Sequence, residues 1–518
     1  MDQGILRAIL AVGRRAESVD IETLQDSFVS VGNIDLRLSS PDHQVIYGRR
    51  GTGKTHTLKY LLSNPSSQTI PMYVDLRSIG SNGSIYNDST LSFTQRASTL
   101  LIDFLGAIHD QLLEIFVDST ELDLSAAGGH LDRFANAIST TRVEGPVSIK
   151  EQRHHEDTAS VKAGVALKKL DPTFNIYVGS TNKEADDSEV SYELAREAHV
   201  IFGDLNAPLK AIAGLAKGKR FVVLVDEWSD IPLELQPFLA DLIRKALIAS
   251  GMTLKIAAIE HRARFAQVSK SGQYVGLQLG ADVMADVNLD DFMVFENDEQ
   301  RAVNFFRNLI YRHCLSNLDK SVAAQYKDES AFILSIFTEK RALEEFVRAA
   351  EGVPRDALNL LNKAAIKAED RRIGVEDVRA AAREWYQSDK AAFINQDVET
   401  KRLLNWIVDK VIRGRKARAF LFDADRREDL IDRLFDSRSL HILKKNISSK
   451  EGGQRFDAYK LDYGCYVDLI KTSMNPNALL DDDLAGLPTD EVPDDDYRAI
   501  RRAILDFSDF AAAGNSAI

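Results

Sequence analysis

The chain has 518 residues, 44% apolar and 28% charged, which is ordinary for a soluble globular protein of about two to four domains. Its formal net charge of −13 excludes a protein that binds nucleic acid over its whole surface. No apolar run is long enough to span a membrane. Two distant cysteines, Cys314 and Cys465, exclude a disulfide framework and a four-ligand zinc site, which favours a reducing cytoplasmic location. Residues 1–17 predict an amphipathic helix rather than a signal peptide.

The first functional motif is GRRGTGKT at residues 48–55, which satisfies every fixed position of the phosphate-binding pattern G-x-x-x-x-G-K-[ST]. It follows an apolar run at 43–48 that predicts a buried strand and precedes a predicted helix at 55–64. Lys54 would reach the β- and γ-phosphates, and the Thr55 hydroxyl would bind Mg²⁺. The residues predicted to hold ATP here are Gly48, Arg49, Arg50, Gly51, Thr52, Gly53, Lys54 and Thr55.

A long segment separates the P-loop from the next functional motif, at residues 226–227. Residues 71–80 predict a second strand, and residues 98–118 predict a long amphipathic helix. We expect an insertion over about 120–195, where alternating apolar and polar residues at 161–184 predict a β-hairpin. We expect its polar stretch at 180–193 to be a loop that contacts a partner protein, a neighbouring subunit or nucleic acid.

An acidic pair follows the apolar run FVVLV at 221–225, which is typical of a central parallel strand. Asp226 is the candidate ligand of Mg²⁺, and Glu227 is the candidate base that orients and deprotonates the attacking water. An Asp-Glu pair in a surface turn is the alternative interpretation.

A P-loop followed by a strand that ends in Asp-Glu resembles the AAA+ ATPases, and the next segments resemble the origin-recognition type of that family. The strand predicted at 253–265 places His261 at the position of a polar sensor residue, although Asn is commoner there and a solvated or core-capping histidine is the alternative. The segment 343–386 resembles the AAA+ helical lid, in which Arg355 matches the second sensor that touches the γ-phosphate. The resemblance covers roughly 40–390 with gaps. It implies an α/β fold with a parallel sheet and a helical lid.

One part of the AAA+ pattern is missing. Rings of this family usually carry an arginine finger near the fifth strand, but no arginine lies between Arg264 and Arg301. Either Arg262 or Arg264 substitutes, or hydrolysis is slow and awaits a partner.

The C-terminal region has a different charge. Residues 401–470 hold 16 Lys and Arg against 11 Asp and Glu. Residues 426–443 have helical periodicity, and helices followed by a basic hairpin resemble a winged helix. The candidate DNA contacts, all of which would bind phosphates without reading sequence, are Arg413, Arg415, Lys416, Arg418, Lys450 and Arg455. A winged helix that binds protein is the alternative, because acidic residues crowd the segment 425–432.

The sequence therefore predicts an AAA+ switch with bound ATP and Mg²⁺, a slow basal ATPase that self-associates and acts on DNA or a partner protein. The alternatives are a signalling ATPase of a bacterial conflict or antiviral defense system that activates a separate effector, and a nucleotide-stabilised scaffold. The expected domains are an N-terminal helical segment (1–40), an AAA+ core (41–300), a helical lid (301–390), a winged-helix-like domain (391–475), and an acidic linker with a final helix (476–518).

Overall fold

A computed structural model gives the fold of the chain. It describes residues 1–13, 19–79, 92–140, 147–151, 190–194, 200–268, 272–291, 295, 298–326, 328–414, 419–448, 453–473 and 504–510. None of the helices in these ranges combines the length and apolar character that crossing a bilayer requires.

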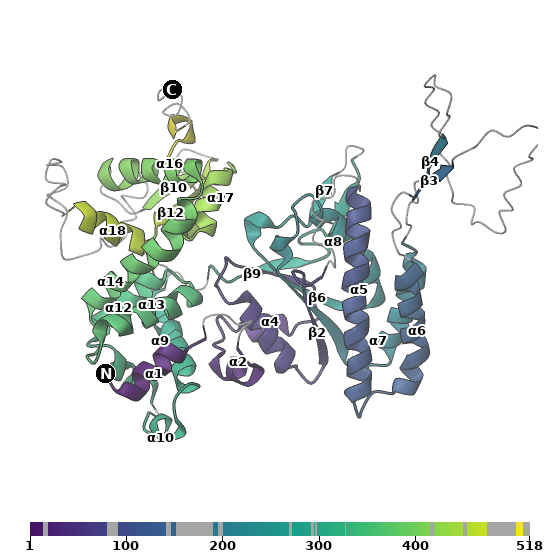
Figure 1. The fold of residues 1–518 in the computed structure, drawn as a ribbon, viewed down its shortest axis with the longest axis horizontal. Helices are drawn as coiled ribbons and strands as arrows, with labels where there is room; N and C mark the ends of the chain where they lie inside the picture. The colour runs from purple at the N-terminus through teal and green to yellow at the C-terminus, as the bar shows by residue number, and fades with distance from the viewer. Residues whose placement is uncertain are drawn as a thin grey trace, which may run out of the picture.

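A five-stranded parallel sheet lies at the centre of the N-terminal half, with the strand order β2-β5-β6-β1-β9 (Figure 1). Its strands are β1 (Gln44–Tyr47), β2 (Thr69–Asp75), β5 (Arg220–Asp226), β6 (Thr253–Ala258) and β9 (Met284–Asn288). The predicted strands at 43–48, 71–80 and 253–265 correspond to β1, β2 and β6, whereas β9 was not predicted. Because neighbouring strands are parallel, the carboxyl ends of β1, β5 and β6 meet at one edge of the sheet.

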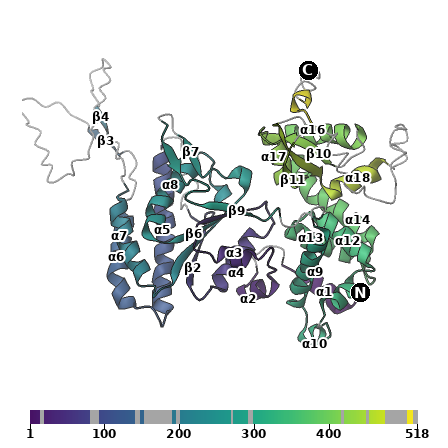
Figure 2. The same ribbon diagram turned by 180° about the vertical axis from the view of Figure 1, so that it is seen from behind.

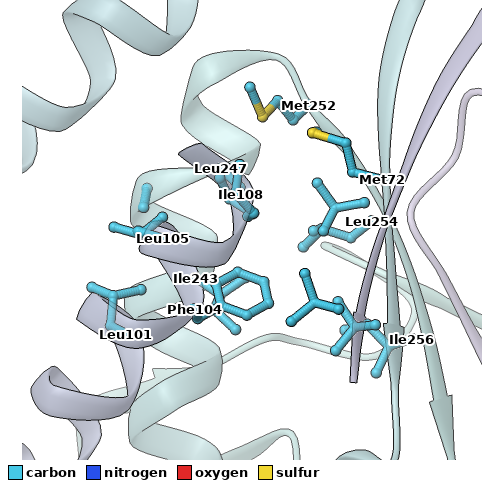
Figure 3. Packing of buried hydrophobic residues seen from close by; sticks show 14 of the residues in the cluster. Met72, Leu101, Phe104, Leu105, Ile108, Ile243, Leu247, Met252, Leu254 and Ile256 are labelled. Atoms are coloured by element: carbon cyan, nitrogen blue, oxygen red, sulfur yellow. The ribbon is translucent and has the colours of Figure 1, made fainter. Parts of the chain in front are cut away.

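Helices cover both faces of this sheet. One face packs against α5 (Phe93–Asp118), α7 (Phe202–Gly214) and α8 (Gln236–Ala246), and α6 (Leu124–Thr140) packs against α5 and α7. Figure 3 shows Phe104 and Ile108 of α5 facing Met72, Leu254 and Ile256 of the strands. The other face packs against α3 (Ile34–Leu38) and α4 (Lys54–Ser63), and α2 (Ile21–Ser27) packs against α4. Burial on both faces explains why the strands read as continuous apolar runs.

Short elements complete the core. The strands β7 (Ala266–Val268) and β8 (Tyr274–Gly276) form an antiparallel pair, as do β3 (Val147–Glu151) and β4 (Val190–Leu194). Single turns of 3-10 helix are η2 (Trp228–Asp230), η3 (Ile248–Ser250) and η4 (Glu260–Arg262). Most of the predicted insertion, including the predicted hairpin at 161–184, lies outside the described residues.

A helical lobe follows the sheet and has its own apolar cluster. Its helices are α9 (Glu299–Leu315), α10 (Lys320–Ala323), α11 (Glu329–Ile336), α12 (Lys340–Ala350), α13 (Pro354–Ala368) and α14 (Val375–Trp385). The N-terminal helix α1 (Gln3–Ala11) packs into the same cluster through Ile5 and Ile9, although the lobe is far from α1 in sequence (Figure 1). The α/β core with a parallel sheet and the helical lid are thus confirmed as the fold class.

The C-terminal unit (residues 398–462) lies beside this lobe, at the end of the molecule remote from α6 in both views (Figures 1 and 2). A π-helical turn η5 (Tyr386–Lys390) and α15 (Ala391–Ile394) lead into it. It contains α16 (Val398–Ile407), the π-helix η6 (Val408–Arg413), β10 (Ala419–Asp423), α17 (Asp429–Asp436), β11 (Leu440–Ser448) and β12 (Arg455–Leu461), and α18 (Tyr463–Ser473) follows it.

The winged-helix prediction is not confirmed. The three strands form an antiparallel sheet in the order β10-β12-β11, and β11 and β12 are the predicted hairpin. Only one helix, α17, lies between β10 and β11, whereas a helix-turn-helix needs two in succession. The helical periodicity predicted over 426–443 is wrong after Asp436, because Leu440–Leu443 belongs to β11. Those residues alternate between the apolar cluster and the far face of the sheet, and strand pairing overrides the helical pattern.

Candidate nucleotide-binding site

The P-loop joins the end of β1 to the start of α4, as its sequence predicts. Gly51 and Gly53 have φ angles of 90° and 99°, which side chains with a Cβ rarely adopt. A Cβ on Gly51 would also lie 2.9 Å from the Cβ of Arg355 on the lid. Both glycines are therefore required by the loop's conformation, and the first turn of α4 points its free backbone N–H groups along the loop.

A polar cavity of about 310 Å³ opens between the P-loop, the acidic strand end and the lid. Arg50, Gly51, Gly53, Lys54 and Thr55 line it from the P-loop side. The other lining residues come from several elements: Gly13, Val19, Leu24, Ser27, His56, Arg77, Glu227, Asp230, Leu309, His313, Pro354, Arg355 and Leu358. The structure thus brings together Lys54, Thr55, Glu227 and Arg355, which sequence reasoning had assigned to one site.

Lys54 is buried, and its ammonium donates to the carbonyl oxygens of Gly48 at 2.7 Å and Arg49 at 3.0 Å. Burial lowers the pKa of Lys54, while the nearby carboxylates of Glu227 and Asp226 act in the opposite direction. A cation held on the loop's own carbonyls lies beside the position that phosphates would occupy.

Asp226 ends β5 with no solvent exposure. Its carboxylate accepts hydrogen bonds from the Tyr73 hydroxyl at 2.8 Å and from the Glu227 amide at 2.9 Å. Burial, together with Asp226, raises the pKa of Tyr73, so that the phenol stays a donor. The carboxylate is fixed in direction by these two bonds.

Glu227 has a left-handed backbone with φ 55° and ψ 37°, an unusual conformation for a non-glycine residue that is commonest at functional positions. Burial, with the negative charge of Asp226, raises the pKa of Glu227, while Lys54 opposes this. One carboxylate oxygen lies 3.5 Å from the Arg77 guanidinium. Arg77 and Tyr73, at the end of β2, were missed by sequence reasoning. No local signal indicated them, because they reach the acidic pair only through the pairing of β2 with β5.

The lid reaches the P-loop through Arg355, at the start of α13. Its backbone N–H donates to the Gly51 carbonyl at 3.1 Å, and its side chain lines the cavity. The loop and the lid therefore meet directly. The role of Arg355 toward a γ-phosphate stays a prediction.

Three predicted residues line a different cavity, and neither Thr52 nor Asp226 lines the first one. His261, Gly48 and Arg49 line a second cavity of about 290 Å³ between the core and the C-terminal unit. His261 has its Nε2 atom 2.6 Å from Asp436 of α17 and packs its ring against Phe435. His261 thus contacts the C-terminal unit. The sequence around His261 could not reveal this contact, because Asp436 lies 175 residues further along the chain.

The arginines proposed as substitutes for a finger differ in their surroundings. Arg262 forms an ion pair with Asp436 at 2.5 Å, so that it too is engaged with the C-terminal unit. Arg264 is exposed, and its backbone N–H donates to Gln236. Neither lines the nucleotide cavity.

Most candidate DNA contacts cannot be placed. Arg415, Lys416, Arg418 and Lys450, together with the side chain of Arg413, lie outside the described residues. Arg455 starts β12 and is exposed near the tip of the β11–β12 hairpin.

The residues around the first cavity fit a nucleoside triphosphate with Mg²⁺. Lys54 and Arg355 line it and supply cations for phosphate oxygens, and Thr55 lines it with a hydroxyl. Asp226 lies buried behind the lining residue Glu227, so that Thr55 and Asp226 would supply the oxygen ligands that Mg²⁺ prefers. The fold and this site together define a P-loop nucleotide-binding core of the α/β class.

One comparison with known proteins agrees with that class. Residues 13–68, which contain the P-loop, match the model of the ORC-CDC6-like family, and this confirms the predicted resemblance for that segment. A solved structure of the Aeropyrum pernix Orc1 protein in complex with DNA aligns at 14% identity, over 87% of this chain and 95% of that chain, with a TM-score of 0.31. A search of curated proteins found no match.

Proposed function

We propose that this protein is an Mg-ATP-dependent switch that hydrolyses ATP slowly and couples its nucleotide state to assembly on DNA or on a partner protein. The observation that carries the proposal is the single polar cavity lined by Lys54, Thr55, Glu227 and Arg355. These four residues come from three segments far apart in sequence. Cations, a hydroxyl and a carboxylate around one cavity are what phosphoryl transfer requires.

Each residue has a defined task in the proposed reaction. Backbone N–H groups of the P-loop and Lys54 hold the phosphates, while Thr55 and Asp226 hold Mg²⁺. Bound Mg²⁺ would neutralise developing charge on the phosphate oxygens. Glu227 accepts a proton from the attacking water, and its raised pKa makes it a stronger base than an ordinary glutamate.

The lid is the moving part that we propose. Arg355 contacts the P-loop through its backbone and faces the same cavity through its side chain. A nucleotide that binds Arg355 would favour the closed lid by the difference between its affinities for the two states.

The basic segments of the C-terminal region support contact with DNA phosphates. The contact would use the hairpin side near Arg455, because the neighbouring helix α17 is engaged with the core through Asp436. The ORC-CDC6-like match at 13–68 also supports a role at DNA.

The test is particle size and ATP turnover of the full chain, with and without duplex DNA, in ADP and in a slowly hydrolysed ATP analogue. We expect ATP-dependent DNA binding that weakens steeply with salt, and turnover that rises on DNA. Nucleotide-dependent assembly without DNA affinity would support the signalling alternative, in which a separate effector is activated. A nucleotide retained without any turnover would support the scaffold.

A further inference from the structure

The P-loop residue Arg49 points its side chain away from the nucleotide cavity and into the C-terminal unit. Its Nε atom donates to Asp290 at 2.7 Å, and its Nη1 atom lies 2.8 Å from Nδ1 of His441 on β11. The guanidinium also stacks over the Phe435 ring, 4.5 Å from its centroid. The side chain is 5% exposed, so that these groups replace water around its charge. Arg49 and His441 are 392 residues apart.

His441 can serve Arg49 only as an acceptor. Burial lowers its pKa well below the ordinary value, helped by the positive charges of Arg49 and Lys390 and opposed by Glu351. The ring is therefore neutral, and because Arg49 donates to Nδ1, the proton belongs on Nε2. That Nε2–H faces a carboxylate oxygen of Asp462 at 3.2 Å.

The contacts continue to the lid. Asp462 pairs with the Lys390 ammonium at 2.5 Å, and Lys390 also pairs with Asp356 at 3.1 Å. Asp356 directly follows Arg355, and Arg438 of the C-terminal unit binds it at 2.9 Å. Although burial raises the pKa of Asp356, the charges of Arg438 and Lys390 outweigh burial and lower it. We name this series, Arg49–His441–Asp462–Lys390–Asp356, the buried polar chain.

The buried polar chain joins both sides of the nucleotide cavity through the C-terminal unit. Its inner members His441, Asp462, Lys390 and Asp356 have side chains only 2% exposed. Removing one member of such a series leaves a buried charge or donor without its partner, which costs far more than breaking an exposed ion pair. The backbone of Arg49 is also held by hydrogen bonds: its N–H donates to Asp290, and its carbonyl accepts from Lys54.

We propose that the C-terminal unit positions the P-loop, and that His441 is the positioning residue that does so through Arg49. The expected effect on nucleotide affinity rests on the proposed function. The expected effect on the conformation of the loop does not. With His441 in place the Arg49 guanidinium has a fixed direction. The loop backbone from Gly48 to Lys54 is then held ready for phosphates.

Other contacts between the C-terminal unit and the core bypass the P-loop and provide a control. Lys445, also on β11, pairs with Glu260 of the core at 2.5 Å. It lies four residues from His441 in the same interface. Lys445→Gln therefore weakens docking while every hydrogen bond of Arg49 keeps its partner, although it also removes a positive charge near Asp290.

The experiment compares the full-length wild type with His441→Ala, His441→Asn, His441→Gln and Lys445→Gln. Asn places an amide oxygen near the position of Nδ1 and keeps an acceptor for Arg49, whereas Gln extends toward the position of Nε2 and does not. The first measurement is amide hydrogen exchange of peptides covering residues 48–55 without nucleotide, with residues 220–226 of β5 as the internal reference. The second is ADP affinity by titration calorimetry.

We expect faster exchange over 48–55 in His441→Ala and His441→Gln, and ADP affinity lowered about tenfold, since a hydrogen bond to a charged group typically changes an equilibrium constant about 10-fold to 100-fold. His441→Asn should stay near the wild type, as should Lys445→Gln and the β5 peptide. If His441→Ala does not fold, the difference between His441→Asn and His441→Gln in exchange over 48–55 and in ADP affinity tests the inference.

Two results would overturn the inference: unchanged exchange over 48–55 in both the Ala and Gln variants, or equal loosening by Lys445→Gln, which would mean that docking alone matters. Failure of the proposed function looks different. In that case the wild type binds no ADP, while the exchange over 48–55 still reports whether His441 positions the loop.

Discussion

Lys255 lies in the middle of the central sheet with no solvent exposure, and its replacement by Met tests the energetics of that burial. Its ammonium donates to the backbone carbonyls of Ser40 at 3.1 Å and Asp42 at 2.9 Å, and to the Gln44 side chain. Burial lowers the pKa of Lys255 to about 8 from 10.5, against the opposing charge of Asp42. The hydrogen bonds thus only partly replace the lost hydration.

The pKa difference fixes how the free energy of unfolding depends on pH. Below pH 8 the folded and unfolded chains both hold the proton, and the cost of burying the charge is fully present. Between pH 8 and 10.5 the folded chain releases a proton that the unfolded chain keeps, so that the free energy of unfolding rises with pH. The rise from this one group is about 3 kcal/mol, at about 1.4 kcal/mol for each pH unit of the difference.

The assay is urea unfolding at a series of pH values from 7 to 10.5, followed by the fluorescence of the buried Trp228, with Trp385 and Trp406 replaced by Phe. The free energy of unfolding of the parent minus that of Lys255→Met should grow by about 3 kcal/mol across this range. Lys340→Met, which removes a lysine whose side chain is 78% exposed, is the matched control. A difference that stays constant within about 1 kcal/mol would refute the argument from burial.

Three further predictions concern the nucleotide site. Lys54→Ala should abolish ATP binding, because it removes the cation held on the P-loop carbonyls, and unchanged affinity by titration calorimetry would contradict the assignment of the cavity. Glu227→Gln should bind ATP normally but hydrolyse it about 10²–10⁴ times more slowly, and a fall of less than about tenfold in turnover would move the base elsewhere. Basal turnover should be slow and should rise with protein concentration or with DNA, because an arginine supplied to the γ-phosphate is worth about 10³–10⁵ in rate in related enzymes. A fast, concentration-independent rate that Arg262→Ala and Arg264→Ala leave unchanged would show that one subunit holds a complete site.

The residues of the P-loop and the acidic pair could be predicted because their signals are local. The glycines at 51 and 53 need left-handed φ angles, and the strand, loop and helix around them follow one another in sequence. The continuous apolar runs at β1, β5 and β6 likewise reveal a sheet buried on both faces. The lid position of Arg355 followed from the resemblance rather than from any pattern of its own.

The helix predicted to run to residue 443 shows where local signals fail. Leu440 and Leu443 are three residues apart, a spacing that also suits a helix. The pairing of Leu440 with Leu461 and of Ile442 with Tyr459 on β12 makes the segment a strand instead. The β9 strand was missed because Met284–Asn288 is short and half polar, and its place beside β1 is set by pairing. Neither pairing can be read from the segment itself.

By itself the sequence determined the α/β class, the P-loop and the acidic pair, since each depends on neighbours along the chain. Only the tertiary structure decided which other groups meet them. Tyr73 and Arg77 reach the acidic pair because β2 lies beside β5, and His261 and Arg262 face Asp436 because the C-terminal unit docks on the core. The Arg49–His441 contact joins residues 392 apart. Contacts of this kind depend on how separately formed units pack, and no local propensity or spacing encodes them.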